Sequence, residues 1–319
     1  METTQSPMLD DLDHQVVQAL MLDGRAAFSK IAAVLGVSDQ TVIRRYRRLR
    51  TAGLLRVVGR RVGLPESWLR VQCTPDVAVA VADALARRPD ISWVTLNSGG
   101  TEVNCMTRAG SRDARDPLLP DPLPHVQRVA GMTAHTVLKV FTGAPSRRPG
   151  ANRLTHEQAA ELERPTHPGT EPVHLDETDL VLLAELARDG RTGCPELARA
   201  TGLSESTARR RMEHLQDVGA LVFDVEIDPA LLGCPTQATL WATVAPADLP
   251  GIAFAAAVTG SANLVAVVLC RDTGELYEFL TDRLGSLPAI QRAELSPVTR
   301  TVKRAGLLTD GHRLVDPAH

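Results

Sequence analysis

The chain of 319 residues has few cysteines, few aromatic residues and almost no net charge. Its five cysteines stand far apart, without a C-x-x-C pair or a histidine at ligand spacing, which argues against a disulfide framework and a zinc site. The net charge of −3 means that any affinity for nucleic acid must come from local clusters of charge. We therefore expect no metal site and no cofactor.

Long apolar runs are also missing. None reaches the roughly 20 residues that a membrane-spanning helix needs. The first residues, METTQSPMLDDLD, are polar and acidic, unlike a secretory signal. These features predict a cytoplasmic protein with no membrane partner.

The chain does contain a long internal repeat. Residues 9–55 recur without a gap at 175–221, so that Asp23-Gly24-Arg25 returns as Asp189-Gly190-Arg191 (189 − 23 = 166). A repeat of this length indicates a duplicated structural unit.

Hydrophobic spacing predicts three helices in the first copy of the repeat. The first ends at Asp23-Gly24, the second runs from Ser29 to Leu35, and the third runs from Asp39 to Thr51. Gly36 suits the left-handed turn between the second and third helices, and Ser38 is placed to cap the third.

Residues 54–58 then predict the first strand of a wing. The order of helix, short helix, tight turn, capped basic helix and strand is typical of a winged helix-turn-helix. We call the two copies head one and head two.

In such a fold the third helix lies in the major groove of double-stranded DNA, with its N-terminal residues near the base edges. Gln40 and Thr41 are the expected base readers, whereas Arg44 and Arg45 could contact either guanine or phosphate. A solvated arginine-rich face is the alternative interpretation. The predicted DNA-binding residues are Ser38, Gln40, Thr41, Arg44, Arg45 and Arg48 in head one, and Ser204, Ser206, Thr207, Arg210 and Arg211 in head two.

The two heads differ in charge. Residues 39–61 hold eight arginines and one acid, whereas the equivalent residues 205–227 hold three arginines and five acids. Because neutralised phosphates supply much of the affinity for DNA, we expect head one to bind more strongly than head two.

A module with β-α-β-β-α-β order is predicted after head one. Its features are a strand at 68–73, a helix at 76–88, two strands flanking a turn at 98–101, and a last strand at 136–141. The second helix, near 112–127, is weakened by four prolines.

The module after head two is shorter. Strands are predicted at 236–244, 252–258 and 264–270, followed by a helix at 276–284. Only a few residues separate the first two strands, so either the first helix of this module or a strand is missing. We favour a missing helix, because residues 258–260 suit the turn that ends a strand.

The predicted fold class is therefore α+β, with two winged helix-turn-helix domains alternating with two ferredoxin-like modules, the second lacking its first helix. The expected domains are 9–63 (head one), 64–142 (sensor module one), 143–174 (linker), 175–233 (head two) and 234–306 (sensor module two).

The motifs of the repeat resemble those of the Lrp/AsnC family of transcriptional regulators. They are L-D-x-x-D at Leu175 to Asp179, D-G-R at 189–191, G-L-S at 202–204 and R-R-x-x-x-L at Arg210 to Leu215. The resemblance covers nearly the whole chain, and the chain looks like a tandem form with two heads and two sensor modules. It implies a DNA-binding regulator rather than an enzyme.

The resemblance also implies that the sensor modules pair sheet to sheet, as an intrachain pseudo-dimer or a homo-oligomer. Amino-acid effectors of the family bind near a G-x-x-D turn between the second and third strands. The matching turns here lack the aspartate. The residues implied for effector binding are Gly99 and Glu102 in the first module and Gly260 and Asn263 in the second.

An enzyme similar to the sirohaem decarboxylases, which resemble this family in fold, is the alternative. It would need histidines at a tetrapyrrole pocket, and the first sensor module has His125 and His135. Aligned at an offset of 164, which also matches Lys139 with Lys303, the second module has Ala289 and Thr299 there instead. The operator sequence, the effector, the sign of regulation and the oligomeric state are left open.

Overall fold

The computed structural model describes residues 9–62, 66–108, 129–141, 153–164, 173–244, 252–287 and 290–317. The chain forms two compact units. One contains both heads and residues 152–174, and the other contains both sensor modules. Among the described residues, no helix has both the length and the apolar character needed to cross a membrane, and no cluster of histidine, cysteine and acidic side chains could hold a metal ion.

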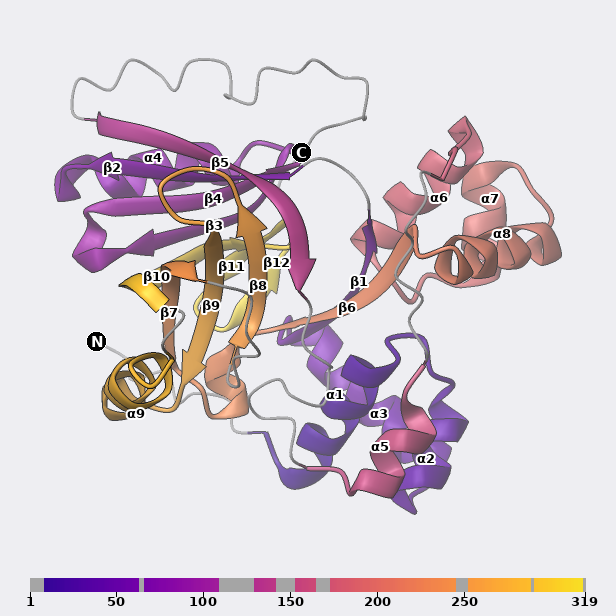
Figure 1. Cartoon of the computed structure of the whole chain (residues 1–319). Helices are drawn as coiled ribbons and strands as arrows, with labels where there is room; N and C mark the ends of the chain where they lie inside the picture. The colour runs from indigo at the N-terminus through magenta and orange to yellow at the C-terminus, as the bar shows by residue number, and fades with distance from the viewer. Residues whose placement is uncertain are drawn as a thin grey trace. The chain divides into compact units, whose positions relative to one another are not determined.

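The two heads fold as predicted, each with three helices followed by a strand (Figure 1). Aspartates cap the first helix of each head, Gly36 and Gly202 take the left-handed conformation at the turn, and Ser38 and Ser204 cap the third helix. The elements are α1 (Asp11–Leu22), α2 (Phe28–Leu35), α3 (Asp39–Thr51) and β1 (Leu55–Arg61) in head one, and α6 (Glu177–Arg188), α7 (Cys194–Thr201), α8 (Glu205–Asp217) and β6 (Leu221–Ile227) in head two.

The strand after each head pairs with the other head. Instead of starting a wing within its own head, β1 runs antiparallel to β6, from Leu55 opposite Ile227 to Arg61 opposite Leu221. The prediction of the strand is confirmed, but its interpretation as the first strand of a wing is wrong, because it pairs with the other head. In a wing, the backbone hydrogen-bonding groups at one edge of β1 would pair with a neighbouring strand of the same head. Here the duplication supplies an equivalent strand from the other head, and β1 pairs with that strand instead.

The repeated D-G-R tripeptide holds the two heads together. Arg25 donates hydrogen bonds to the carbonyl oxygens of Gly190 and Thr192, and Arg191 donates to those of Gly24 and Ala26, so the contact is reciprocal. Burial lowers the pKa of both guanidinium groups.

The segment predicted as a linker contains the short helix α5 (His156–Leu162), which packs against head one. Gln158 donates to the carbonyl oxygen of Val34 at 3.0 Å, and Gln18 accepts from the amide of Leu154 at 3.0 Å. Leu162 is fully buried. This part of the expected linker is therefore docked on a head.

The sensor modules contribute eight strands to one closed ring, in the order β10-β3-β4-β2-β5-β8-β9-β7, with β7 pairing back to β10. The first module supplies β2 (Glu66–Cys73), α4 (Pro75–Ala86), β3 (Ile91–Asn97), β4 (Glu102–Arg108) and β5 (Val129–Phe141). The second supplies β7 (Thr236–Val244), β8 (Ile252–Val258), β9 (Leu264–Cys270), α9 (Thr273–Glu278) with a π-helical turn (Phe279–Leu284), and β10 (Ile290–Arg304).

Two long strands close this ring by crossing from one module to the other. The first part of β5 pairs with β2 and its last part pairs with β8, while β10 pairs first with β7 and then with β3. The predicted sheet-to-sheet pairing therefore occurs within one chain. Strand β5 begins at Val129, earlier than the predicted Thr136, because its first half is needed to pair with β2.

Other predictions for the modules have mixed outcomes. Residues 252–258 form β8, the next described element after β7 along the chain, which agrees with the missing first helix. The helix predicted near 112–127 lies outside the described residues. A hairpin of β11 (Leu307–Asp310) and β12 (Arg313–Val315) extends β10 and was not predicted.

The contact between the heads leads to a stability prediction. A methyl group on Gly190 would lie 2.9 Å from side-chain atoms of Phe223 and Val57 and 3.0 Å from the backbone of Val58. Overpacking of this kind costs about 1–3 kcal/mol, so Gly190→Ala should lower the unfolding temperature of the head unit by several degrees in a thermal scan.

Gly131→Ala is the control, because its added methyl would meet only the side chain of Gln72, at 3.7 Å. Equal unfolding temperatures for the two variants would show that the packing around Gly190 does not hold the heads together.

Candidate nucleic-acid interface and a cavity in the sensor unit

One face of α3 is free of packing and combines the side chains needed to read DNA. Gln40, Arg44 and Arg47 recur at helical spacing and are exposed, whereas Val42, Tyr46 and Leu49 face the core. Ser38 accepts a hydrogen bond from the amide of Thr41 at 3.2 Å, which fixes the start of the helix. Arg47 was not among the predicted residues, although its spacing from Gln40 and Arg44 could have identified it.

Arg45 and Arg48 have a different environment. Arg45 forms ion pairs with Asp10 and with Asp13, the latter at 3.1 Å, and Arg48 also pairs with Asp13. Asp13 is 1% exposed. The second arginine of the R-R pair therefore ties α3 to the start of α1, and only the first, Arg44, points freely outward.

Head two repeats this arrangement with weaker basic character. Arg211 pairs with Asp176 at 2.7 Å and with Asp179 at 2.8 Å, as Arg45 does in head one. At the positions equivalent to Gln40, Arg44 and Arg47, α8 exposes Ser206, Arg210 and Glu213, and Arg209 beside them is exposed as well. A carboxylate thus replaces one guanidinium on this face.

Some of the charge counted in the sequence does not belong to the helix faces. Arg60 of β1 pairs with Asp224 of β6 at 2.8 Å, and Arg56 lies opposite Glu226 in the register of the two strands. The charge difference between the faces of the heads is therefore smaller than the sequence count. On the reading helices, Arg47 is exchanged for Glu213, Arg48 for His214 and Arg50 for Gln216, whereas Ile43 is exchanged for Arg209.

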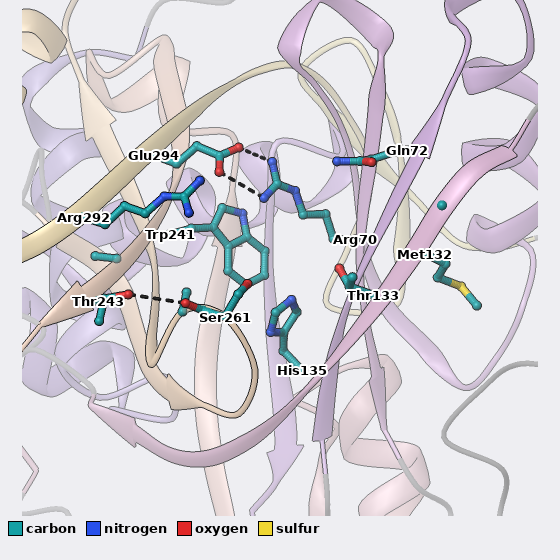
Figure 2. A pocket seen from close by; sticks show the side chains of 13 residues that line it. Arg70, Gln72, Met132, Thr133, His135, Trp241, Thr243, Ser261, Arg292 and Glu294 are labelled. Carbon is teal, nitrogen blue, oxygen red and sulfur yellow. Dashed lines mark hydrogen bonds and ion pairs between the residues drawn. The ribbon is translucent and has the colours of Figure 1, made fainter.

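The sensor unit contains a cavity of about 390 Å³ between strands of the two modules. Its walls include Arg70 from β2, His135 from β5, Trp241 from β7, and Arg292 and Glu294 from β10 (Figure 2). A cavity of this size suits a small organic ligand.

Stacking and ion pairs order one side of the cavity. The rings of His135 and Trp241 are 4.7 Å apart between centroids, and the Arg70 guanidinium carbon lies 5.6 Å from the centroid of Trp241. Arg70 forms ion pairs with Glu102 and Glu294. The hydrogen bond that Arg70 donates lowers the pKa of Glu294, which keeps this carboxyl group ionised.

The structure places only some of the residues predicted for effector binding near the cavity. The turn containing Gly260 lies at the cavity, where Ser261 and Ala262 are part of the wall. Glu102 is buried and is not part of the cavity wall. It accepts hydrogen bonds from Arg70, which is part of the wall, and, at 2.7 Å, from Asn104. Gly99 and Asn263 are not part of the cavity wall.

The structure also changes the alignment of the two modules. His135 lies opposite Trp68 in the strand register, and the residue in the matching place of the second module is Ser296, opposite Thr239. The register pairs Lys139 with Ala257 and Arg300 with Leu96, so Arg300, rather than Lys303, is the counterpart of Lys139. The equivalences of His135 with Thr299 and of Lys139 with Lys303 were therefore wrong. His125 and Ala289 lie outside the described residues.

Comparison with known proteins supports both parts of this description. The AsnC-type helix-turn-helix domain matches residues 9–50 and 175–216, and the Lrp/AsnC ligand-binding domain matches residues 244–308. The HTH-type transcriptional regulator FL11 of Pyrococcus horikoshii is 31% identical over 142 residues, which is 41% of this chain and 93% of FL11. The chain belongs to the Lrp/AsnC family.

Two further proteins are similar to this chain, one in sequence and one in fold. The HTH-type transcriptional regulator Rv2324 of Mycobacterium tuberculosis is 29% identical over 136 residues, which is 39% of this chain and 91% of that protein. The crystal structure of the siroheme decarboxylase NirDL superposes with a TM-score of 0.58 over 92% of this chain and 93% of NirDL, at 12% identity. The likeness to NirDL shows that the fold is shared over almost the whole chain, and no more.

The ion pairs of Asp13 lead to a prediction for the stability of head one. Asp13→Asn removes the buried carboxylate charge that pairs with both Arg45 and Arg48. We therefore expect the free energy of unfolding, measured with denaturant, to fall by about 1–3 kcal/mol. Asp11→Asn is the matched control, because the Asp11 side chain is 88% exposed and an exposed pair contributes only about 0–1 kcal/mol.

The effect of Arg45 should depend on pH. The hydrogen bond from Arg45 lowers the pKa of Asp10 from 3.8 to about 2. A depressed carboxyl pKa stabilises the fold above the unfolded value and loses this effect as the pH falls through the folded value. The stability difference between the wild type and Arg45→Ala should therefore be constant above about pH 5 and shrink toward pH 2. A difference that grows on acidification would contradict this role of Arg45.

Proposed function

We propose that this protein is a sequence-specific DNA-binding transcriptional regulator that reads DNA mainly through α3 of head one. The exposed row of Gln40, Arg44 and Arg47 carries this proposal, because it places one amide and two guanidinium groups at the spacing of a major-groove reading face. The regulator relatives and the two AsnC-type domains support the same function.

Of the eleven residues predicted to bind DNA, we now assign Gln40, Thr41, Arg44, Ser206 and Arg210 to base or phosphate contacts. Ser38 and Ser204 act by capping the reading helices, with Thr207 donating to the Ser204 cap. The remaining three, Arg45, Arg48 and Arg211, position these helices through their ion pairs, although the 52% exposed side chain of Arg48 can also reach phosphate.

Both heads of one chain bind the same DNA in this proposal. They are joined by the β1–β6 pairing and the reciprocal contacts of Arg25 and Arg191, so one chain presents two reading helices. Their half-sites should be separated by whole turns of DNA, about 10 base pairs or a multiple.

We further propose that the sensor unit responds to a small metabolite of the amino-acid class, as the Lrp/AsnC ligand-binding domain suggests. The turn at Gly260 and the cavity beside it are the best candidate location. Gly99 and Glu102 would contribute by shaping the first module, since Glu102 fixes the guanidinium of Arg70.

An enzyme related to the siroheme decarboxylases is the second candidate. The specific observation in its favour is that His135 and two arginines line one cavity. The exposed basic row on α3 favours the regulator, because chemistry in the sensor unit would not require it. A shift of the absorbance spectrum when an iron tetrapyrrole is titrated into the protein, followed by release of carbon dioxide, would favour the enzyme.

The DNA-binding proposal predicts a strong effect of the exposed arginines of α3. In the full chain, Arg44→Ala and Arg47→Ala should each weaken operator binding by about 1–3 kcal/mol if they contact bases. Loss of a phosphate contact should instead make the slope of the logarithm of the binding constant against the logarithm of the salt concentration shallower by about 0.9. Gel-shift titrations at several salt concentrations measure both quantities.

Variants of head two are the matched comparison. Arg210→Ala should cost less than Arg44→Ala, and Glu213→Arg should strengthen binding by restoring the guanidinium that head one has at this position. Equal losses from Arg44→Ala and Arg210→Ala would contradict the dominance of head one, and an unaffected Arg44→Ala/Arg47→Ala double variant would contradict the proposed reading face.

A further inference from the structure

The strand register of the sensor unit defines an approximate two-fold axis that exchanges its modules. Arg70 on β2 lies opposite Asn104 and Thr133, and Trp241 on β7 lies opposite the residues 161 positions after these, Val265 and Glu294 (265 − 104 = 294 − 133 = 161). The same operation relates the pairing of β5 with β8 to that of β10 with β3.

The cavity lies on this axis. The two-fold operation exchanges most of the polar wall residues with one another. A cavity within a single module could not have this property, because the operation would move it to the other module. The exchanged pairs are Arg70 with Trp241, Gln72 with Thr243, Gly131 with Arg292, and Thr133 with Glu294. We call it the axial cavity.

A cavity on the axis of a dimer of identical chains has the same residue on both sides, because such an interface is self-complementary. A ligand without two-fold symmetry then binds equally well in two opposite orientations. In this chain the four exchanged pairs consist of different residues. The duplication has therefore made a site that can distinguish the two ends of one ligand.

The charges of the axial cavity favour an anion at one end. Arg292 is exposed and forms no ion pair with any described residue, although its charge helps to lower the pKa of Glu294; its counterpart on the other side of the axis is Gly131. The single acid of the wall, Glu294, is already paired with Arg70. A guanidinium outside an ion pair can bind a carboxylate through two parallel N–H groups that match its two oxygens.

One buried polar group of the wall lacks a partner, and a second side chain of the wall can accept a hydrogen bond. The Nε1 atom of Trp241 is buried and has no acceptor among the described residues. His135, 5% exposed, has Nδ1 at 2.7 Å from the carbonyl oxygen of Thr259, so Nδ1 carries the proton. In the neutral ring Nε2 is then an acceptor. Buried polar groups in native proteins are nearly always satisfied, so the buried indole N–H of Trp241 points to a ligand.

We propose that the axial cavity binds one small carboxylate per chain in a single orientation. Arg292 holds the carboxylate, and His135 accepts a hydrogen bond from an amino or hydroxyl group at the other end of the ligand. As an effector site this inference rests on the proposed regulatory function, whereas ligand binding itself does not depend on it.

The test is isothermal titration of the full chain with L-alanine, L-leucine, L-lactate and 2-hydroxy-4-methylpentanoate, and with L-leucinamide and lactamide as neutral counterparts. We expect at least one carboxylate to bind with a stoichiometry of one per chain and its amide to bind at least about tenfold more weakly. Failure of all four carboxylates to bind, or binding of two per chain, would overturn the proposal.

Variants assign the site. Arg292→Ala should weaken binding at least about tenfold, and Trp241→Phe should weaken it while keeping an aromatic ring beside His135. Arg300→Ala is the control, because Arg300 is an exposed arginine on the same strand outside the axial cavity. If Arg292→Ala and Arg300→Ala bind alike, the axial cavity is not the site.

The same proteins separate this inference from the proposed function. Arg292→Ala without ligand should bind operator DNA as the wild type does. If the wild type binds the carboxylate but no DNA, the proposed function fails and the axial site stands. If it binds DNA but no carboxylate, the axial site fails and the DNA-binding function stands.

Discussion

Strand pairing between the two halves of the chain is the interaction on which the rest of the structure depends. In the head unit β1 pairs with β6, and in the sensor unit β5 and β10 each cross from one module to the other. Both partners of every such pair are in one covalent chain, so the pairing does not depend on protein concentration as it would between separate copies. The effective concentration of each strand near its partner is fixed by the intervening chain.

This constraint separates the positions that must match from those that are free to differ. Arg25 and Arg191 form equivalent bonds, because each half still has to bind the other. The reading helices carry Arg47 in one head and Glu213 in the other, and the axial cavity has Arg292 on one side and Gly131 on the other. These two differences lie outside the reciprocal contacts of Arg25 and Arg191.

The helices, the caps and the missing helix of the second module could be predicted from the sequence, because they follow from local spacing and from the repeat. Tertiary partners could not. The pattern of β1 fits a wing strand and an interhead strand equally well, and an R-R pair does not show that Arg45 turns back toward Asp13 while Arg44 points outward. The residues that line the axial cavity are brought together by the strand register, which the sequence does not show. In this register the counterpart of His135 is Ser296, an equivalence that the sequence offset of 164 missed.

We propose that one chain reads DNA with two unequal heads. Selection of bound duplexes from random DNA by the full chain, followed by sequencing, tests it most directly. We expect a site with one strongly specified half and one weakly specified half, separated by a whole number of helical turns. A palindromic site with equal sequence information in both halves would contradict unequal reading by the two heads.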